Sequence, residues 1–163
     1  MEQAFIQMIN EHRGTIFKVC NLYCGQEENR KDLFQEIVLQ LWKAYPSFRN
    51  ESTKNTWIYR VALNTAISNL RKEGRKPGSD ELREEQLQLP DIPYFSGEAD
   101  RSSLLHLAIS QLTAIEKALI MLYLDERSYD EIRQVLGISH SNVGVRLNRI
   151  KHKLSKLIQP TAI

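Results

Sequence analysis

Residues 32–76 read DLFQEIVLQLWKAYPSFRNESTKNTWIYRVALNTAISNLRKEGRK, and this stretch decides the fold class. Apolar residues recur there every three or four positions in two successive runs. That period predicts two amphipathic helices, over about 29–45 and about 53–73. Ser52 and Thr53 are each suitable N-caps for the second helix. Both predicted helices carry a second face that burial in a core does not explain.

The first helix has one side that fits a protein partner. We expect its buried side to consist of Phe34, Ile37, Val38, Leu41 and Tyr45. The opposite side mixes carboxylates and amides with large apolar groups, and it consists of Asp32, Gln35, Glu36, Leu39, Trp42 and Lys43. Exposed large apolar side chains are typical of surfaces that partners cover. The alternative is that Leu39 and Trp42 only widen the buried stripe.

The second helix has one face whose side chains are typical of proteins that bind single-stranded nucleic acid. Its expected buried residues are Tyr59, Leu63, Ala66, Ile67 and Leu70. Its other face contains no acid and consists of Trp57, Arg60, Asn64, Ser68 and Arg71. An aromatic ring can stack on a base, an amide can bond a base edge, and arginines can bind phosphates. A plain surface helix with Trp57 in the core remains the alternative.

Charge divides the chain of 163 residues into three parts. Residues 1–76 carry 12 basic and 8 acidic side chains, residues 77–103 carry 2 and 7, and residues 104–163 carry 8 and 5. A chain of this length suits one domain or two small ones. The pattern predicts an all-α protein with two small helical domains, 1–76 and 104–163, joined by an acidic flexible linker over 77–103.

The predicted linker and the N-terminus indicate what the chain can bind and in which compartment it is expected. The linker contains short apolar pieces that can dock on a partner or on the flanking domains, namely Leu87, Leu89, Ile92, Tyr94 and Phe95. The N-terminus carries acid early, and the longest apolar run, residues 118–124, is too short to span a membrane. We therefore expect a soluble cytoplasmic protein without membrane insertion.

No catalytic or metal-binding motif is visible in the sequence. Cys20 and Cys24 lie four positions apart, but no second cysteine pair completes a zinc site, so reduced, packed thiols are expected. His140 and His152 are too far apart on a helix for a local metal pair. Phosphate-binding glycine loops and hydrolase motifs are absent from the sequence. We expect no enzyme activity, no cofactor, no metal and no small-molecule substrate.

The C-terminal part has the pattern of a helix-turn-helix domain. Four helices are predicted, over about 103–111, 113–124, 129–136 and 140–157. Ser128 and Glu131 form a capping-box pattern at the start of the third helix, Gly137 ends it, and Ser139 can cap the fourth. A helix, a short glycine turn and a second helix are the parts of this DNA-binding motif.

The last helix has the composition of a recognition helix. Its predicted apolar stripe is Val143, Leu147, Ile150, Leu154 and Leu157. The reverse side consists of Ser141, Val145, Asn148, Arg149, His152 and Lys156. Between Gly144 and Lys156 there are five lysines or arginines and no acid. Small residues let a helix enter the major groove, and amides and cations then contact bases and phosphates. A basic surface helix of a bundle is the alternative.

Together these features resemble the extracytoplasmic-function sigma factors, the compact two-domain members of the sigma-70 family of bacterial transcription initiation factors. The resemblance covers most of the chain. It rests on Asp32-x-x-Gln35-Glu36, Leu39-x-x-Trp42, Phe48, Thr56-Trp57-x-Tyr59-Arg60-x-Ala62-x-Asn64, Leu112-Thr113, Tyr129-x-Glu131-Ile132, Leu136-Gly137-Ile138-Ser139, Val143 and Arg146-Leu147.

The resemblance implies three binding surfaces. Core RNA polymerase, through the coiled coil of its β′ subunit, would bind Asp32, Gln35, Glu36, Leu39 and Trp42. Single-stranded DNA of the melted minus-10 element would bind Phe48, Arg49, Asn50, Lys54, Trp57, Arg60, Asn64 and Arg71. The minus-35 duplex would bind Ser141, Asn142, Gly144, Val145, Arg146, Asn148, Arg149, Lys151 and Lys153. The β flap of the polymerase is a further implied partner, and family members are commonly held inactive by an anti-sigma factor.

The sequence departs from the family pattern at three positions. Arg133 stands where a small residue is common, which implies either looser packing or an arginine that extends outward. Gly144 and Val145 stand where basic or hydroxyl residues are common, so the upstream recognition sequence is expected to differ from the common one.

The expected function is promoter recognition, DNA melting and transcription initiation by core polymerase. A free-standing helix-turn-helix regulator is the first alternative, and it would not need the face with Asp32, Gln35 and Glu36. An adaptor without DNA binding is the second, and Gly144 and Val145 favour it slightly.

Overall fold

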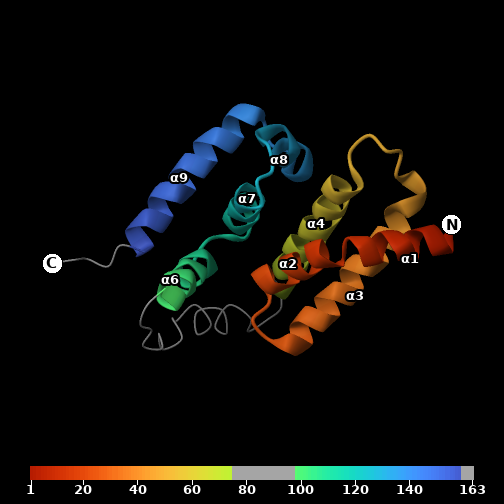
Figure 1. The fold of residues 1–163 in the computed structure, drawn as a ribbon, viewed down its shortest axis with the longest axis horizontal. Helices are drawn as coiled ribbons and strands as arrows, with labels where there is room; N and C mark the ends of the chain where they lie inside the picture. The colour runs from red at the N-terminus through yellow and green to blue at the C-terminus, as the bar shows by residue number, and fades with distance from the viewer. Residues whose placement is uncertain (75–97, 159–163) are drawn as a thin grey trace.

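The computed structural model describes residues 1–74 and 98–158, and all regular structure in these ranges is helical (Figure 1). The N-terminal domain contains α1 (Glu2–Glu11), α2 (Arg13–Tyr23), α3 (Glu27–Ala44), the short 3-10 helix η1 (Tyr45–Ser47) and α4 (Lys54–Gly74). The C-terminal domain contains α6 (Glu98–Ser110), α7 (Ala114–Leu124), α8 (Tyr129–Leu136) and α9 (His140–Ile158). The predicted all-α fold with two helical domains is confirmed.

The predicted linker lies largely outside the described residues, together with its apolar pieces Leu87, Leu89, Ile92, Tyr94 and Phe95. Its last part is different from the prediction, because α6 begins at Glu98 and not near 103.

Local side-chain chemistry fixes several helix ends. The Thr53 hydroxyl accepts a hydrogen bond of 3.1 Å from the backbone N–H of Thr56, so Thr53 caps α4. Ser128 and Glu131 form the predicted capping box at the start of α8. Gly137 ends α8 in the left-handed region, at φ +70°. The hydroxyl of Ser139 accepts from the backbone N–H of Asn142 at 3.2 Å and caps α9.

The buried stripe of α3 differs from the predicted one. Ile37 and Leu41 are fully buried as expected, and they are joined by Leu33. The other predicted members, Phe34, Val38 and Tyr45, are only partly buried. Partners on α1 and α2 explain the change: the Phe34 ring stacks on Phe17 at a centroid distance of 4.7 Å, and the Tyr45 ring lies 5.3 Å from Phe5. The stripe is therefore centred closer to Leu33 than the prediction placed it.

Helix α4 lies at the centre of the molecule and is covered on two sides. Tyr59, Leu63, Ala66 and Ile67 are buried as predicted, whereas Leu70 is only half-buried. Ile58 and Ala62 are also buried, because α4 packs on α2 and α3 on one side and on α7 and α8 on the other. The buried side chains of both domains consequently form one continuous hydrophobic cluster.

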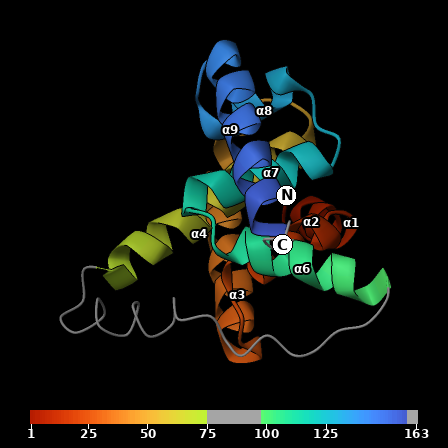
Figure 2. The same cartoon turned by 90° about the vertical axis from the view of Figure 1, so that its left-hand side faces the viewer.

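The helix-turn-helix pair α8 and α9 packs side by side (Figure 2). Val143, Leu147, Ile150 and Leu154 of α9 are buried as predicted. The prediction was wrong for Leu157, which is 40% exposed, and Ile158 packs against the core instead. An α-helix drifts by about 20° per heptad relative to a strict 3.5-residue repeat, so over the two heptads from Val143 the buried line turns by about 40° and Leu157 lies at its margin.

Candidate nucleic-acid and polymerase interfaces

The face of α3 opposite the core is exposed. Asp32 and Gln35 are exposed, Glu36 is half-buried, and Leu39 and Trp42 keep 44% and 41% of their surface accessible. The alternative that Leu39 and Trp42 belong to the core does not fit these values. Large apolar groups exposed beside carboxylates form a surface that a protein partner can cover and shield from water.

Sequence reasoning missed the contribution of α1 to this surface. An open groove of about 450 Å³ runs between α1 and α3 and is lined by Glu2, Phe5, Ile6, Phe34, Gln35, Val38, Leu39 and Trp42. The ring of Trp42 meets that of Phe5 edge-on at a centroid distance of 4.9 Å, and Ile6 is 51% exposed. The apolar period of residues 5–9 in the sequence was the signal that could have placed α1 here.

The predicted single-strand surface divides into an aromatic part and a polar part. Trp57 is half-buried, and its ring packs on Phe48 at 4.7 Å and lies 6.4 Å from Tyr45. Phe48 is half-buried as well. This cluster holds the loop that connects η1 to α4, and it leaves Trp57 less accessible than a free stacking platform.

The polar residues of this surface are accessible. Six of the predicted single-strand contacts are exposed, namely Arg49, Asn50, Lys54, Arg60, Asn64 and Arg71. Asn50 adopts φ +58°, a left-handed conformation that asparagine tolerates better than most residues. Beside Asn64, a polar groove between α3 and α4 is lined by Glu36, Gln40, Ala44, Val61, Thr65, Ser68, Asn69 and Lys72. Amides and hydroxyls in such a groove suit the edge of an unpaired base.

The outer face of α9 is accessible along most of its length. The exposed residues among the predicted duplex contacts are Ser141, Asn142, Val145, Arg146, Asn148, Arg149 and Lys153. Gly144 is half-buried, and a Cβ added there would lie 3.5 Å from a ring carbon of Tyr129, an ordinary contact. The small residues Ser141 and Gly144 near the start of α9 allow this end of the helix to approach the floor of a groove closely.

Two of the predicted duplex contacts also interact within the domain. The ammonium of Lys151 lies 4.0 Å from the centroid of the Tyr123 ring. Lys153 forms an ion pair of 3.1 Å with Glu116. Partial burial acts to raise the pKa of Glu116, but hydrogen bonds from the Thr113 backbone and from Lys153 outweigh it and hold the pKa below its usual value.

Arg133 extends outward from α8. It is exposed, and its guanidinium lies 3.8 Å from the carboxylate of Asp130. Of the two outcomes that the sequence left open, the structure shows the arginine directed to solvent.

The cysteines and histidines form no visible site. Cys20 is buried, and burial followed by the proximity of Cys24 raises the pKa of its thiol to about 11, so the thiol is unreactive at neutral pH. No disulfide joins these two residues. Within residues 1–74 and 98–158, no three metal-ligating side chains come together, and no helix there is long and apolar enough to cross a membrane.

Comparison with known proteins assigns both domains. Residues 8–76 match the family model of sigma-70 region 2, and residues 102–154 match that of sigma-70 region 4. This chain belongs to the sigma-70 family, as an extracytoplasmic-function sigma factor. It is 25% identical to the RNA polymerase sigma-H factor of Pseudomonas aeruginosa and 27% identical to the ECF RNA polymerase sigma-E factor of Escherichia coli K12. Both alignments cover 98% of this chain and 88% of the relative.

Solved structures show the same fold. The sigma factor RpoE of Bartonella quintana, in complex with the anti-sigma factor NepR, superposes with a TM-score of 0.72 at 19% identity and covers 98% of this chain and 99% of its own. CnrH, in complex with the cytosolic domain of CnrY, gives 0.67 at 21% identity and covers 99% and 92%.

The function follows from the family. This sigma factor binds bacterial core RNA polymerase and directs promoter recognition and transcription initiation. Sigma factors are initiation factors and are not known as enzymes. The free-standing regulator is not favoured, because both sigma regions match in their usual order.

Proposed function

We propose that three exposed faces of this sigma factor each bind a different partner during initiation. The face of α3 binds core polymerase, the face of α4 with the preceding loop binds unpaired bases of the minus-10 element, and the outer face of α9 binds the minus-35 duplex. The exposure of Leu39 and Trp42 beside Asp32 and Gln35 is the observation that carries the proposal. We further propose that the protein acts in the cytoplasm, where polymerase is found.

On α3, apolar contact and charge act together. A partner that covers Leu39 and Trp42 gains the hydrophobic free energy of two large side chains. The nearby carboxylates of Asp32 and Glu36 select a partner helix with basic residues, since complementary charge mainly provides specificity and speed of encounter. In the family this partner is the β′ coiled coil.

On α4, the exposed amide of Asn64 beside the polar groove holds an unpaired base, and Arg60 and Arg71 bind the backbone. Unstacking costs a few kcal/mol per base. One amide and one aromatic cluster cannot offset this cost over a whole bubble, so polymerase has to supply the remainder. Free protein is therefore expected to bind promoters weakly and with steep salt dependence.

On α9, Asn148 and Arg149 contact base edges, and the other cations contact phosphates. Gly144 and Val145 provide no donor toward the groove. We propose that these two positions give the protein an upstream element different from that of relatives with basic or hydroxyl residues there.

Binding to core polymerase tests the central assignment. The triple variant Asp32→Ala, Gln35→Ala, Glu36→Ala should lose binding in gel filtration with purified core enzyme while its helix content stays unchanged. The matched control is Glu11→Ala with Glu27→Ala, which also removes two acids, both of them exposed, but leaves the central α3 face intact. Equal binding by the triple variant and the control would refute the assignment.

A further inference from the structure

The outer face of α9 has an exposed apolar side chain at its centre. Val145 is 47% exposed, although valine is among the residues most often buried in proteins. Residues three or four positions away share its side of the helix. All four of them are exposed and polar, namely Ser141, Asn142, Asn148 and Arg149. Val145 therefore lies in the middle of the residues expected to contact the upstream duplex.

The free protein gains nothing from a valine at this position. An apolar side chain in water is unfavourable, and β-branched residues are poorer helix formers than alanine. In a helix, however, valine adopts one rotamer in about 90% of cases, so its two methyl groups are held in one orientation. Val145 is thus a rigid apolar group that can contact a partner with little loss of side-chain entropy.

DNA offers one matching group in the major groove. The C5 methyl group of thymine is the alkyl group that the bases display there, beside hydrogen-bond donors and acceptors. A donor or acceptor covered by an apolar side chain loses its hydrogen bonds to water and gains none. A valine at the groove floor therefore favours a thymine methyl group and disfavours the polar edge of a G·C pair.

The residues around Val145 allow so short a side chain to reach a base. Ser141 lies one turn earlier and is small, and Gly144 has no side chain. Gly144 is half-buried beside Tyr129 of α8, where an added Cβ would lie 3.5 Å from a ring carbon. No long side chain on this part of α9 keeps the backbone away from the groove, so the methyl groups of Val145 can contact a base edge.

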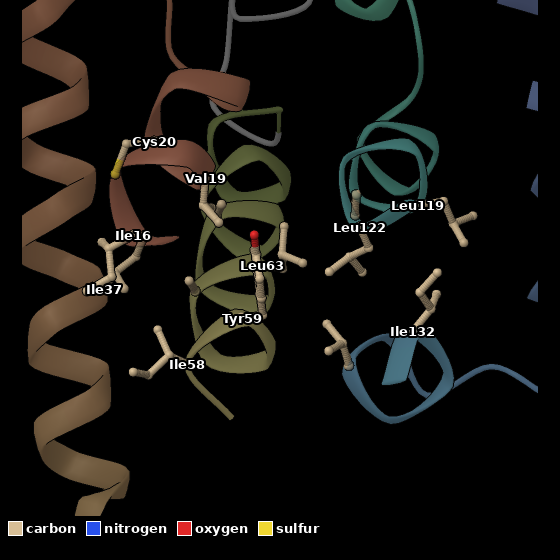
Figure 3. Close-up of a cluster of buried hydrophobic side chains, with 14 of the residues drawn as sticks. Ile16, Val19, Cys20, Ile37, Ile58, Tyr59, Leu63, Leu119, Leu122 and Ile132 are labelled. Atoms are coloured by element: carbon tan, nitrogen blue, oxygen red, sulfur yellow. The ribbon is translucent and has the colours of Figure 1, made fainter. Parts of the chain in front are cut away.

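Packing within the C-terminal domain holds Val145 in its outward orientation. Ile132 of α8 points toward Leu122 of α7, and neither has accessible surface (Figure 3). Val143 and Leu147 of α9, which precede and follow Val145 by two residues, are also fully buried. Since α9 is fixed in the core on both sides of this position, Val145 cannot turn inward.

We propose that Val145 recognises the C5 methyl group of a thymine in the upstream promoter element and thereby selects an A·T pair at that position. The inference rests on the proposed function, because it requires the outer face of α9 to bind this duplex. Side chains three and four residues apart on a helix are about 5–6 Å apart, and successive base pairs are about 3.4 Å apart. Bases contacted by Asn148 and Arg149 should therefore lie one or two base pairs from this thymine.

Replacement of thymine by uracil tests the inference, since it removes the C5 methyl group and keeps every hydrogen-bonding group of the base. The upstream motif is first obtained by transcription from randomised promoters with core polymerase and the full chain. Each thymine of either strand of the motif is then replaced in turn, and the modified promoter competes with the unmodified one for the complex of polymerase and this protein. One replacement should reduce binding about fourfold, the contribution of one buried methyl group.

Truncation of the valine supplies the matching measurement on the protein. Val145→Ala removes the two methyl groups, and the variant should fold because alanine is the better helix former. The preference for thymine over uracil should disappear in this variant. Leu157→Ala is the matched control, because Leu157 is also an exposed apolar residue of α9, at 40%, but lies near the other end of the helix. This control should keep the full preference for thymine.

The outcomes separate this inference from the proposed function. An upstream motif without an A·T pair, or one in which no replacement by uracil changes binding, would overturn the recognition of thymine by Val145 and leave the proposed function standing. A preference for thymine that persists in Val145→Ala would overturn it too, because another group would then contact the methyl. Transcription that needs the protein but no upstream motif would instead overturn the proposed role of α9, and this inference with it.

Discussion

The hydroxyl of Tyr59 on α4 lies 2.7 Å from Oδ2 of Asp125 after α7 and donates a hydrogen bond to it, which joins positions 66 residues apart in the chain. Burial, followed by this hydrogen bond, raises the pKa of Tyr59 well above its usual value. Tyr59 therefore stays protonated as a donor over the whole physiological range. This hydrogen bond joins α4 of the N-terminal domain to the end of α7 in the C-terminal domain.

Removing that hydroxyl should weaken the contact between the two domains without a loss of packing. Tyr59→Phe keeps the buried ring but leaves Asp125 with one donor fewer, and a hydrogen bond to a charged group contributes about 1–3 kcal/mol. We expect the free energy of unfolding to fall by about 1–2 kcal/mol in urea titrations. Tyr123→Phe, at an exposed tyrosine of α7, is the control and should change it little. Equal stability of both variants would show that the hydrogen bond contributes nothing.

Stability should decrease at acid pH because of Asp125. Burial acts to raise its pKa, but the hydrogen bonds from Lys18, Tyr59 and Arg127 outweigh it and hold the pKa below the unfolded value of 3.8. A carboxyl with a depressed pKa stabilises the fold above its unfolded pKa and loses this effect as pH falls through the folded value. Melting temperatures should thus be nearly flat from pH 7 to 5 and fall below about pH 4. The melting temperature of Asp125→Asn should fall less steeply over that range. A slope equal to that of the wild type would exclude Asp125 as the cause of the acid sensitivity.

Replacement of two glycines of the helix-turn-helix by alanine should change the stability of the protein in opposite directions. Gly144 lies inside α9 with room for a Cβ, so Gly144→Ala should stabilise the protein by about 0.5–1 kcal/mol. Gly137 adopts φ +70°, where a side chain is strained, so Gly137→Ala should destabilise it by about 1–2 kcal/mol. Thermal melts of both variants test the pair. A destabilising Gly144→Ala would mean that α9 does not continue through this position as described.

Local and long-range features differ in how well the sequence predicts them. The caps at Thr53, Ser128 and Ser139 and the left-handed Gly137 were predictable, because each depends on a few neighbouring residues. The burial of Leu33 in place of Phe34 was not, since it depends on rings contributed by α1 and α2.

The contact between the domains left only a partial sign in the sequence. Asp125 and Lys18 look like ordinary surface charges until the fold brings them within 2.9 Å. The apolar residues Ile58 and Ala62 lie beside the predicted stripe and widen it, and both are buried in the structure. They were a partial sign of this contact, because a helix that is apolar over more than half its circumference is covered on two sides.

Binding of duplex DNA by the outer face of α9 should depend strongly on Arg149. Arg149→Ala should weaken binding to a duplex selected from random sequences by the wild-type protein, by about 1–3 kcal/mol, or roughly fivefold to 150-fold. Arg133→Ala is the matched control, because Arg133 is exposed on the adjacent α8 and pairs with Asp130. Filter-binding titrations at one fixed salt concentration measure both. Equal losses in the two variants would indicate general charge attraction in place of a specific contact by Arg149.

The most direct test of promoter recognition is transcription by bacterial core polymerase from a pool of randomised promoters, with and without this protein, followed by sequencing of the DNA upstream of each start. We expect transcripts that depend on the protein and share two motifs separated by one and a half turns or more. The upstream motif should change when Val145 is replaced by arginine. Transcription that is no greater than with core polymerase alone, from a protein shown to be folded, would contradict the assignment of promoter recognition to this chain.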